Sequence, residues 1–366
     1  MSHTLPGTDV VIESLPKVSL HDHLDGGLRP QSIIDLAPEH ELQLPTTEAG
    51  ELAQWFANQS DSGSLVEYLK TFDITTGVMQ TAPALQRIAR EFVEDLYADG
   101  VICGELRWAP EQHLRRGLSL DEAVEAVQAG IDEAVGAIRA KGGQMWAGQL
   151  VSAMRQADNG LEIAKLALRH RGNGAWGFDI AGPEAGFPPS RLKDAFDLLS
   201  SEFFPITVHA GEADGVESIR GALLDGRALR LGHGVRIVED MDITSDDEGL
   251  RVELGQLAQW VLDRGIALET SPSSNLQTGA VGEGAQMVNH PFDLLYRLGF
   301  VVTVNTDNRL MSHTTLSREL AFLAETFHYD VDDLMAFQIN AAHAAFVHRD
   351  EKDEIIDVII DGFDVG

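Results

Sequence analysis

Short apolar runs rich in β-branched residues alternate along the chain with longer segments of helical periodicity. In residues 119–140, for example, apolar positions recur at intervals of three and four, and the opposite face is acidic. Strands that are apolar on both faces and alternate with helices are typical of βα units in a parallel sheet. Eight strand-like runs are present, at 17–23, 101–108, 144–154, 175–182, 204–212, 229–235, 265–275 and 300–308. The pattern predicts an α/β protein with a closed (β/α)8 TIM barrel.

The interval between the first two predicted strands is too long for a single βα unit. Residues 44–95 are therefore interpreted as a helical lid inserted after the first strand. The chain contains no fixed-period repeat, no low-complexity stretch and no Pro/Ser-rich linker. We predict one domain that spans residues 1–366, a length that suits a barrel with an insertion.

Acidic residues outnumber basic ones by more than two to one. The chain has 58 Asp and Glu against 27 Lys and Arg, which gives a formal net charge of −31. Nucleic acid and anionic membranes are bound by clustered Lys and Arg, so the composition argues against both partners. Cys103 is the only cysteine, and the chain has neither a signal peptide at its start nor an apolar stretch of about 18 residues. We expect a cytoplasmic protein without disulfide bonds.

Two histidines stand two residues apart in the stretch SLHDHLDGG, at the end of the first predicted strand. Side chains two apart on a strand point to the same face, so His21 and His23 are placed to hold one metal ion between them. The alternative is a pair of hydrogen-bonded, inert histidines in a polar strand end. This stretch alone favours neither interpretation.

Polar residues also follow three later strands. The fifth predicted strand ends with His209 and Glu212 in VHAGE, the sixth with His233 in LGHG, and the eighth with Asp307 and Asn308 in VNTDN. The carboxyl ends of barrel strands meet at one rim, where active sites of this fold lie. Burying a lone polar group is costly, so the repeated placement predicts one functional site.

Three imidazoles and one carboxylate form the predicted metal-binding group. His21, His23, His209 and Asp307 make a nitrogen-rich set that suits Zn²⁺ and leaves room for a water. Zinc lowers the pKa of a bound water towards ~7 and so supplies hydroxide at neutral pH. The fourth predicted strand, GFDIAG, offers no lysine that would bridge a second ion. We predict one Zn²⁺ per subunit and a site that adds water to an electrophile.

The motifs LHDHLDG, GFDIAG, HAGE, LGHG, SPSSN and NTDN occur in this order over nearly the whole chain. Together they resemble the adenosine deaminase family of the amidohydrolase superfamily. HAGE combined with LGHG points to the deaminase branch, and NTDNRLMS is similar to its bacterial members. The segment SGSLVEYLKTFD resembles the lid that closes over the nucleoside in that family.

The resemblance implies a role for each residue of the reacting centre. His21, His23, His209 and Asp307 would hold zinc. Glu212 would protonate N1 of the purine as hydroxide attacks C6 and ammonia then leaves. Its alternative role is that of a carboxylate at a helix N-terminus. His233 would orient the attacking water and take its proton, and Asp307 would also accept a hydrogen bond from that water.

Substrate contacts follow from the same resemblance. The backbone N–H of Gly182 would face N3 of the purine, and Asp25 would accept a hydrogen bond from the ribose 5′-hydroxyl, which a 5′-phosphate would disturb by repulsion. An apolar gate would be formed by one helix face, whose alternative role is plain core packing: Leu65, Tyr68, Leu69 and Phe72.

Two positions depart from the family pattern. Asn308 stands where the second of two aspartates is usual, and its amide donates to N7 without having to be protonated. Ser271 stands where cysteine is frequent, and no mechanistic reason for it is evident. Four further histidines are predicted to lie outside the site, with His343 packed in the core: His290, His313, His328 and His343.

The expected function is zinc-dependent deamination of adenosine, and of 2′-deoxyadenosine, to the inosine product and ammonia in purine salvage. The expected partners are a purine nucleoside and water, with no nucleic acid or membrane, in a monomer or small homo-oligomer. Three alternatives remain: deamination of another adenine-bearing compound, such as adenine or a futalosine-type nucleoside; a catalytically silent nucleoside-binding protein; and an amidohydrolase acting on amides or esters.

Overall fold

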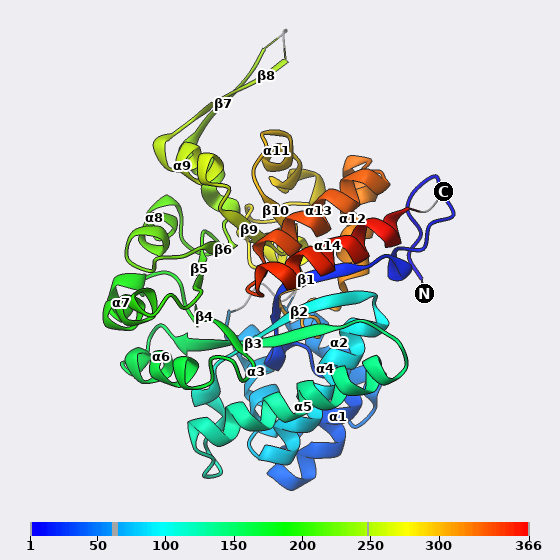
Figure 1. Ribbon diagram of the computed structural model, residues 1–366, viewed down its shortest axis with the longest axis vertical. Coiled ribbons are helices and arrows are strands. Elements are labelled where there is room, and N and C mark those ends of the chain that lie inside the picture. The colour runs from blue at the N-terminus through cyan, green and yellow to red at the C-terminus, as the bar shows by residue number, and fades with distance from the viewer. Residues whose placement is uncertain (1, 61–64, 247–248, 365–366) are drawn as a thin grey trace.

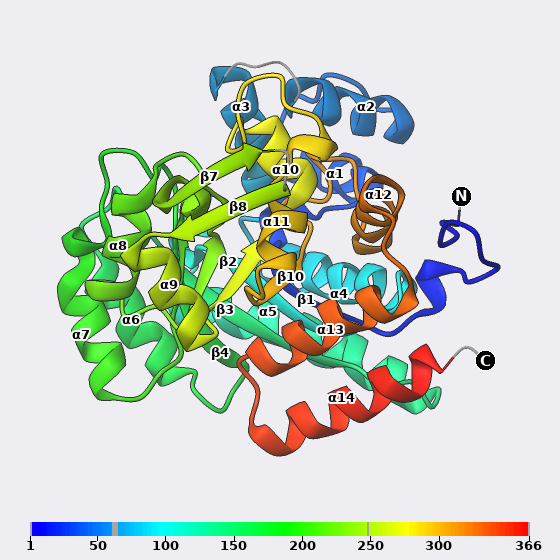
Figure 2. The same ribbon diagram turned by 90° about the horizontal axis from the view of Figure 1, so that it is seen from above.

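The computed structural model describes residues 2–60, 65–246 and 249–364. Within these residues, eight parallel strands close into a barrel (Figures 1 and 2). They pair as two four-stranded sheets, β1-β2-β3-β4 and β10-β9-β6-β5. Parallel bridges from Phe178 to Ile206 and from Asp22 to Asp307 join the sheets at their edges. The predicted (β/α)8 barrel is confirmed.

The barrel strands coincide with the predicted runs, although the last four are shorter than expected. Their bounds are β1 (Lys17–His23), β2 (Val101–Trp108), β3 (Trp146–Met154), β4 (Ala175–Ala181), β5 (Thr207–Ala210), β6 (Arg230–His233), β9 (Ala267–Thr270) and β10 (Val302–Val304). The predicted run 265–275 is wrong at its end, because helix α10 (Pro272–Gln277) begins at Pro272. Proline fits the first position of a helix, where its missing N–H leaves no bond unmade.

Helices follow the strands around the barrel (Figure 2). Helix α5 begins with a capping box in which Ser119 and Glu122 bond to each other's backbone. Besides α10, the helices after β2 are α5 (Leu120–Ala140), α6 (Gly160–Arg169), α7 (Lys193–Ser201), α8 (Val216–Leu224), α9 (Gln256–Arg264), α11 (Phe292–Arg297), α12 (Leu316–Phe327), α13 (Val331–Ala344) and α14 (Arg349–Phe363). Short 3-10 turns are η1 (Ile12–Ser14), η2 (Leu24–Gly26), η3 (Ala37–His40), η4 (Pro110–His113), η5 (Pro189–Leu192), η6 (Val235–Asp240) and η7 (Met287–Asn289).

Four helices lie between β1 and β2, where the sequence predicts a helical insertion: α1 (Pro30–Leu36), α2 (Ala49–Ser60), α3 (Leu65–Val78) and α4 (Ala82–Ala98). Helix α4 packs closely on α5, since a Cβ on Gly130 would overlap the carbonyl oxygen of Gln86. It also contacts β2, as the outer helix of a βα unit does. Helices α2 and α3 lie side by side at one edge of the molecule (Figure 2). Their role as a lid, and the single-domain division, stay predictions.

An antiparallel pair of strands, β7 (Met241–Asp246) and β8 (Gly249–Leu254), extends away from the barrel (Figure 1). The sequence analysis did not predict it. Ile243 pairs with Val252 on a face that also includes Leu250, and Ile243 and Leu250 are exposed. Among the residues described, no helix has the length and apolar character needed to cross a membrane.

Charged side chains of alternating sign run through the barrel interior. Arg230 pairs with Glu105 and, at 2.6 Å, with Oε1 of Glu269. The other oxygen of Glu269 lies 2.6 Å from Arg107, which also lies 3.2 Å from Asp179. All five are at most 1% exposed. Each buried charge therefore has an opposite partner, without which burial would cost several kcal/mol.

Candidate active site

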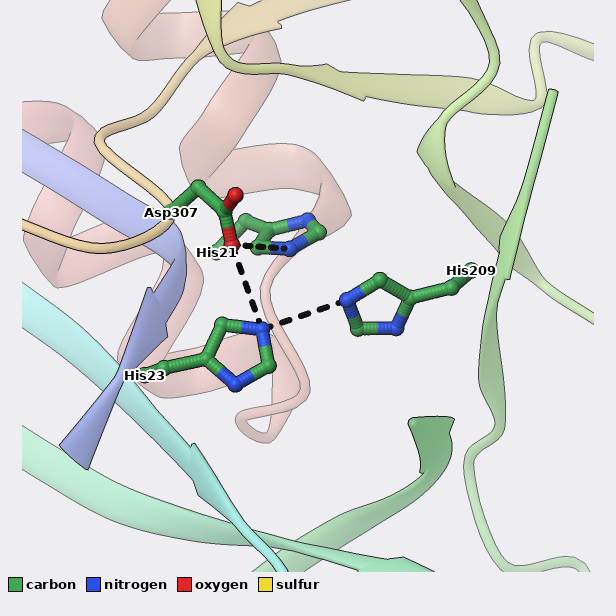
Figure 3. A group of neighbouring side chains, drawn as sticks. All are labelled: His21, His23, His209 and Asp307. Atoms are coloured by element: carbon green, nitrogen blue, oxygen red, sulfur yellow. Dashed lines mark hydrogen bonds and ion pairs between the residues drawn. The ribbon is translucent and has the colours of Figure 1, made fainter. Parts of the chain in front are cut away.

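His21, His23, His209 and Asp307 meet at the carboxyl end of the barrel (Figure 3). Nε2 of His23 lies 3.2 Å from Nε2 of His209, and both His21 and His23 place Nε2 within 3.4 Å of Oδ1 of Asp307. One ligand atom from each residue lies within 4.8 Å of the others. The structure thus brings together all four predicted metal-binding residues.

The donor set fits a metal ion. Nε2 of His21 is buried and has no hydrogen-bond partner among the described residues. Burial and the positive charge of Arg107 lower the pKa of His21 to about 4, so the ring is neutral and its nitrogen has a free lone pair. Nε2 of His23 and Nε2 of His209 face each other at 3.2 Å, close to the carboxylate of Asp307. A cation between these atoms would be bound by all three.

The outer nitrogens of two of these histidines are held by buried carboxylates. Nδ1 of His21 lies 3.1 Å from Glu269, and Nδ1 of His209 lies 2.9 Å from Asp179. Such partners fix the ring orientation and leave Nε2 for the metal. Arg107 contacts both carboxylates and thereby links the two supports. The sequence analysis missed these three supporting residues, although a charge inside an apolar strand such as GFDI is a usable signal.

Glu212 and His233 lie beside the metal-binding group. Nε2 of His233 is 3.4 Å from Oε2 of Glu212, and both lie within 4.8 Å of Asp307. Burial raises the pKa of Glu212, and the neighbouring His233 only partly offsets this rise. For Asp307, burial is outweighed by the adjacent imidazoles of His21 and His23, so its pKa lies well below the usual value. The site therefore combines a carboxyl group that tends to stay protonated with one that stays ionised.

Two of these side chains are presented by strained backbone. His233 has φ 66° and Asp307 has φ 58°, in the left-handed region that residues other than glycine rarely adopt. Such conformations cost about 1–3 kcal/mol each and cluster at functional sites. A hydrogen bond of 2.6 Å from Ser274 Oγ fixes Oδ2 of Asp307.

Glu184, on the loop after β4, binds the turn that carries Glu212. Its carboxylate accepts hydrogen bonds from the backbone N–H groups of four consecutive residues at 2.6–3.1 Å, those of Gly211, Glu212, Ala213 and Asp214. Burial raises the pKa of Glu184, but these bonds, one from Ser218 and the charge of Arg155 bring it below its usual value. The sequence analysis did not identify Glu184, because no local pattern reveals such a partner.

The predicted substrate-binding residues lie around the same end of the barrel. Asp25 lies 3.9 Å from His23, and its Oδ1 is buried without a hydrogen-bond partner in the described chain. Burial raises the pKa of Asp25 to about 6. Gly182 has φ 98°, a conformation that favours glycine, and a Cβ on Gly26 would overlap the side chain of Asn308.

Helix α3 contacts η2, the turn that contains Asp25. Phe72 on this helix is half-buried. The side chains of the other three predicted gate residues lie outside the described part of the structure: Leu65, Tyr68 and Leu69.

The other histidines differ in their surroundings. His313 and His328 are exposed, and neither belongs to the two His/Asp/Glu groups found among the described residues. The prediction that His343 packs in the core is wrong, because it lies exposed near the end of α13. His290 lies outside these groups as well, but it is connected to His233 through hydrogen bonds of Asn275.

An eight-stranded βα barrel that gathers three histidines and an aspartate at its strand ends defines a metal-dependent hydrolase of the amidohydrolase type. The family model described as "Adenosine deaminase" matches residues 16–362. The chain therefore belongs to the adenosine deaminase family.

Curated relatives agree with this assignment, and a solved structure shares the fold. "Adenosine deaminase 1" of Streptomyces coelicolor is 52% identical over 96% of this chain and 88% of its own length. "Adenosine deaminase" of Mycobacterium ulcerans is 51% identical over 97% of each chain. An amidohydrolase from Burkholderia ambifaria with bound Zn has a TM-score of 0.82 at 23% identity and covers 100% of this chain and 96% of its own. At that identity the likeness concerns the fold alone.

Proposed function

We propose that this protein catalyses hydrolytic deamination of adenosine and 2′-deoxyadenosine to the inosine products and ammonia, in purine salvage. The observation that carries the proposal is the position of Glu212 beside the four metal-binding residues. A proton donor for a ring nitrogen and a water-activating group then share one site. The names of the relatives, at about half identity over nearly the whole chain, support the same substrate.

We propose Zn²⁺ as the metal, one per subunit, held by His21, His23, His209 and Asp307. Three nitrogen ligands and one carboxylate match the preference of zinc. When bound, zinc lowers the pKa of water towards ~7 and so supplies a nucleophile at neutral pH. His21 and His209, held from behind by Glu269 and Asp179, are oriented for this role before any metal binds.

Glu212 is proposed as the acid that protonates N1 of the purine. Burial raises the pKa of this carboxyl group, which favours the protonated form that an acid needs. Protonation of N1 draws electrons away from C6 as the oxygen of water bonds to that carbon. The bond from C6 to the amino nitrogen then breaks, ammonia leaves, and a carbonyl remains at C6. Asp307, which is ionised, accepts a hydrogen bond from the attacking water, and His233 orients it.

Four groups are proposed to hold the nucleoside. Asp25 accepts a hydrogen bond from the ribose 5′-hydroxyl, a role that its buried and unpartnered Oδ1 supports. The N–H of Gly182 donates to N3 and the amide of Asn308 to N7. The face of α3 that carries Leu65, Tyr68, Leu69 and Phe72 covers the sugar side. Free adenine has no hydroxyl for Asp25, and the charge of AMP would repel it.

The test is the fall in ultraviolet absorbance of zinc-loaded protein, measured in parallel on adenosine, 2′-deoxyadenosine, adenine and AMP. We expect a rapid fall in absorbance with the two nucleosides only. A chelator should abolish this activity, and added zinc should restore it. Turnover of adenine or AMP but not of the nucleosides would contradict the substrate assignment. No change with any of the four would contradict the proposed function. The cytoplasmic location and the small assembly stay predictions.

A further inference from the structure

A chain of buried hydrogen bonds ends on the imidazole of His233. Nδ1 of His233 lies 2.9 Å from Nδ2 of Asn275, and Oδ1 of Asn275 lies 3.2 Å from Nε2 of His290. The three side chains are 1%, 0% and 3% exposed in that order. Since a hydrogen bond needs one donor and one acceptor, fixing the direction of one bond constrains the rest.

Two backbone N–H groups fix the directions independently, because a backbone N–H only donates. That of Ser271 lies 3.2 Å from Oδ1 of Asn275, so this atom is the oxygen and the amide nitrogen faces His233. That of Phe292 lies 3.1 Å from Nδ1 of His290, so Nδ1 is the acceptor. Burial lowers the pKa of His290 to about 3, hence the ring is neutral and its one hydrogen is on Nε2. That hydrogen points to the oxygen of Asn275. The N–H groups of Ser271 and Phe292 therefore imply the same direction for the bond between His290 and Asn275.

The consequence falls on His233. The amide nitrogen of Asn275 has hydrogens and no usable lone pair, so Nδ1 of His233 must accept. In a neutral imidazole the hydrogen is then on Nε2, the tautomer being assigned here from its partners. Nε2 is the nitrogen that faces Glu212, at 3.4 Å. His233 thus presents a hydrogen, not a lone pair, to the reacting centre.

We propose that Asn275 and His290 are positioning residues that hold His233 as the Nε2–H tautomer, so that His233 donates a hydrogen bond to the attacking oxygen instead of removing a proton from it. This inference rests on the proposed function and replaces the prediction that His233 takes the proton of the water. It also gives His290, which the sequence analysis set aside, a role at the active site.

The protons balance without a base at His233. Glu212 first gives its proton to N1 and becomes a carboxylate, which then takes the proton lost by the water as the oxygen bonds to C6. It returns that proton to the amino nitrogen, which leaves as ammonia, and the hydroxyl proton at C6 restores the acid as the carbonyl forms. No net proton is gained or lost by the protein. The hydrogen bond from Nε2 stabilises charge on the oxygen throughout.

The tautomer is measured directly by ¹⁵N NMR of ring-labelled protein, metal-free and zinc-loaded, because a ring nitrogen with a hydrogen resonates far from one with a lone pair. His233→Gln identifies the signals. We expect Nε2 of His233 to carry the hydrogen and Nδ1 to lack it. Hydrogen on Nδ1 with a lone pair on Nε2 would overturn the proposal. The spectra need no turnover, so this result is independent of whether adenosine is the substrate.

Asn275→Asp reverses the bond with little change of shape. A carboxylate only accepts, so it calls for hydrogen on Nδ1 of His233. We expect a ¹⁵N signal for protonated Nδ1, unchanged zinc content, and adenosine turnover lower by at least about 100-fold, since a reversed tautomer has a large cost in the serine protease triad. Wild-type turnover in this variant would refute the proposal. If the variant fails to fold, the wild-type spectra decide alone.

His290→Gln tests the far end of the chain, with His170→Gln as its control. His170 is 5% exposed, close to the 3% of His290, but it follows α6 and pairs with Asp121, away from the site. We expect His290→Gln to broaden or shift the ring signals of His233 and to lower kcat more than KM, whereas His170→Gln leaves both unchanged. Equal effects of the two variants would mean that His290 acts through stability alone.

Discussion

Replacement of Glu184 by glutamine perturbs the hydrogen bonds that hold the turn carrying Glu212 and leaves the Glu212 side chain itself unchanged. Oε2 of Glu184 accepts from three backbone N–H groups and Oε1 from one, that of Gly211. The amide of glutamine is best placed with its nitrogen at the Oε1 position. Gly211 N–H then faces a donor, while three bonds to a charged acceptor become bonds to a neutral one.

The magnitude follows from these four bonds. An unsatisfied buried N–H costs about 1–3 kcal/mol, and each loss of charge assistance about 1 kcal/mol. Because contributions from neighbouring groups do not add fully, we expect the free energy of unfolding to fall by about 3–5 kcal/mol. The backbone of Glu212 then loses its fixed position, and kcat for adenosine should fall while zinc content is unchanged.

Urea-induced unfolding and steady-state kinetics measure the two effects. Glu91→Gln is the control, since Glu91 is equally buried at 6% exposure and its carboxylate bonds to the side chains of Ser32 and Arg87, not to backbone N–H groups. A loss of stability in Glu184→Gln no greater than in Glu91→Gln would refute the reasoning. So would full turnover in a protein destabilised by the expected amount, because position would then not matter for Glu212.

Four other outcomes are expected. Glu212→Gln should bind zinc and nucleoside yet lose about 10²–10⁴-fold in turnover, because an amide cannot deliver the proton; near wild-type activity would contradict the assignment. Since burial raises the pKa of Glu212 and the protonated form acts, kcat/KM should fall as the pH rises through that pKa, and a flat profile would count against this role. Asp25→Ala should weaken the binding of nucleosides with a 5′-hydroxyl about 10–100-fold more than the binding of their 5′-deoxy analogues. Equal losses of affinity for both would show that Asp25 does not bind the 5′-hydroxyl. A free zinc concentration about 1,000 times Kd should stabilise the apoprotein by ~4 kcal/mol, which a thermal scan detects and His209→Ala should abolish.

The sequence predicted the barrel because its signals are local: apolar runs, helical periodicity and polar residues at strand ends. The convergence of His21, His23, His209 and Asp307 followed from topology, since the carboxyl ends of parallel strands share one rim. The β7–β8 pair was missed, although the alternating residues of LRVEL and the Asp- and Gly-containing stretch before them are usable signals for paired strands.

The supporting residues could not be predicted in the same way. Glu184 bonds to a turn 27–30 positions away, and Arg107 reaches Glu269 across 162 positions of sequence. His290 was set aside because its own neighbours in sequence carry no chemistry, and only the intervening Asn275 connects it to His233. Side-chain partners of this kind depend on the packed arrangement of distant elements.

The division of the barrel into two sheets makes metal binding a property of the assembled protein. The first sheet supplies His21 and His23, and the second supplies His209, with Asp307 just beyond its last strand. Arg107 and Glu269, which stand behind the histidines, come from opposite sheets as well. Neither sheet alone holds all four metal-binding residues. High-affinity zinc binding should therefore appear during refolding only after the two sheets have associated. The rate at which zinc is bound then measures the rate of that association.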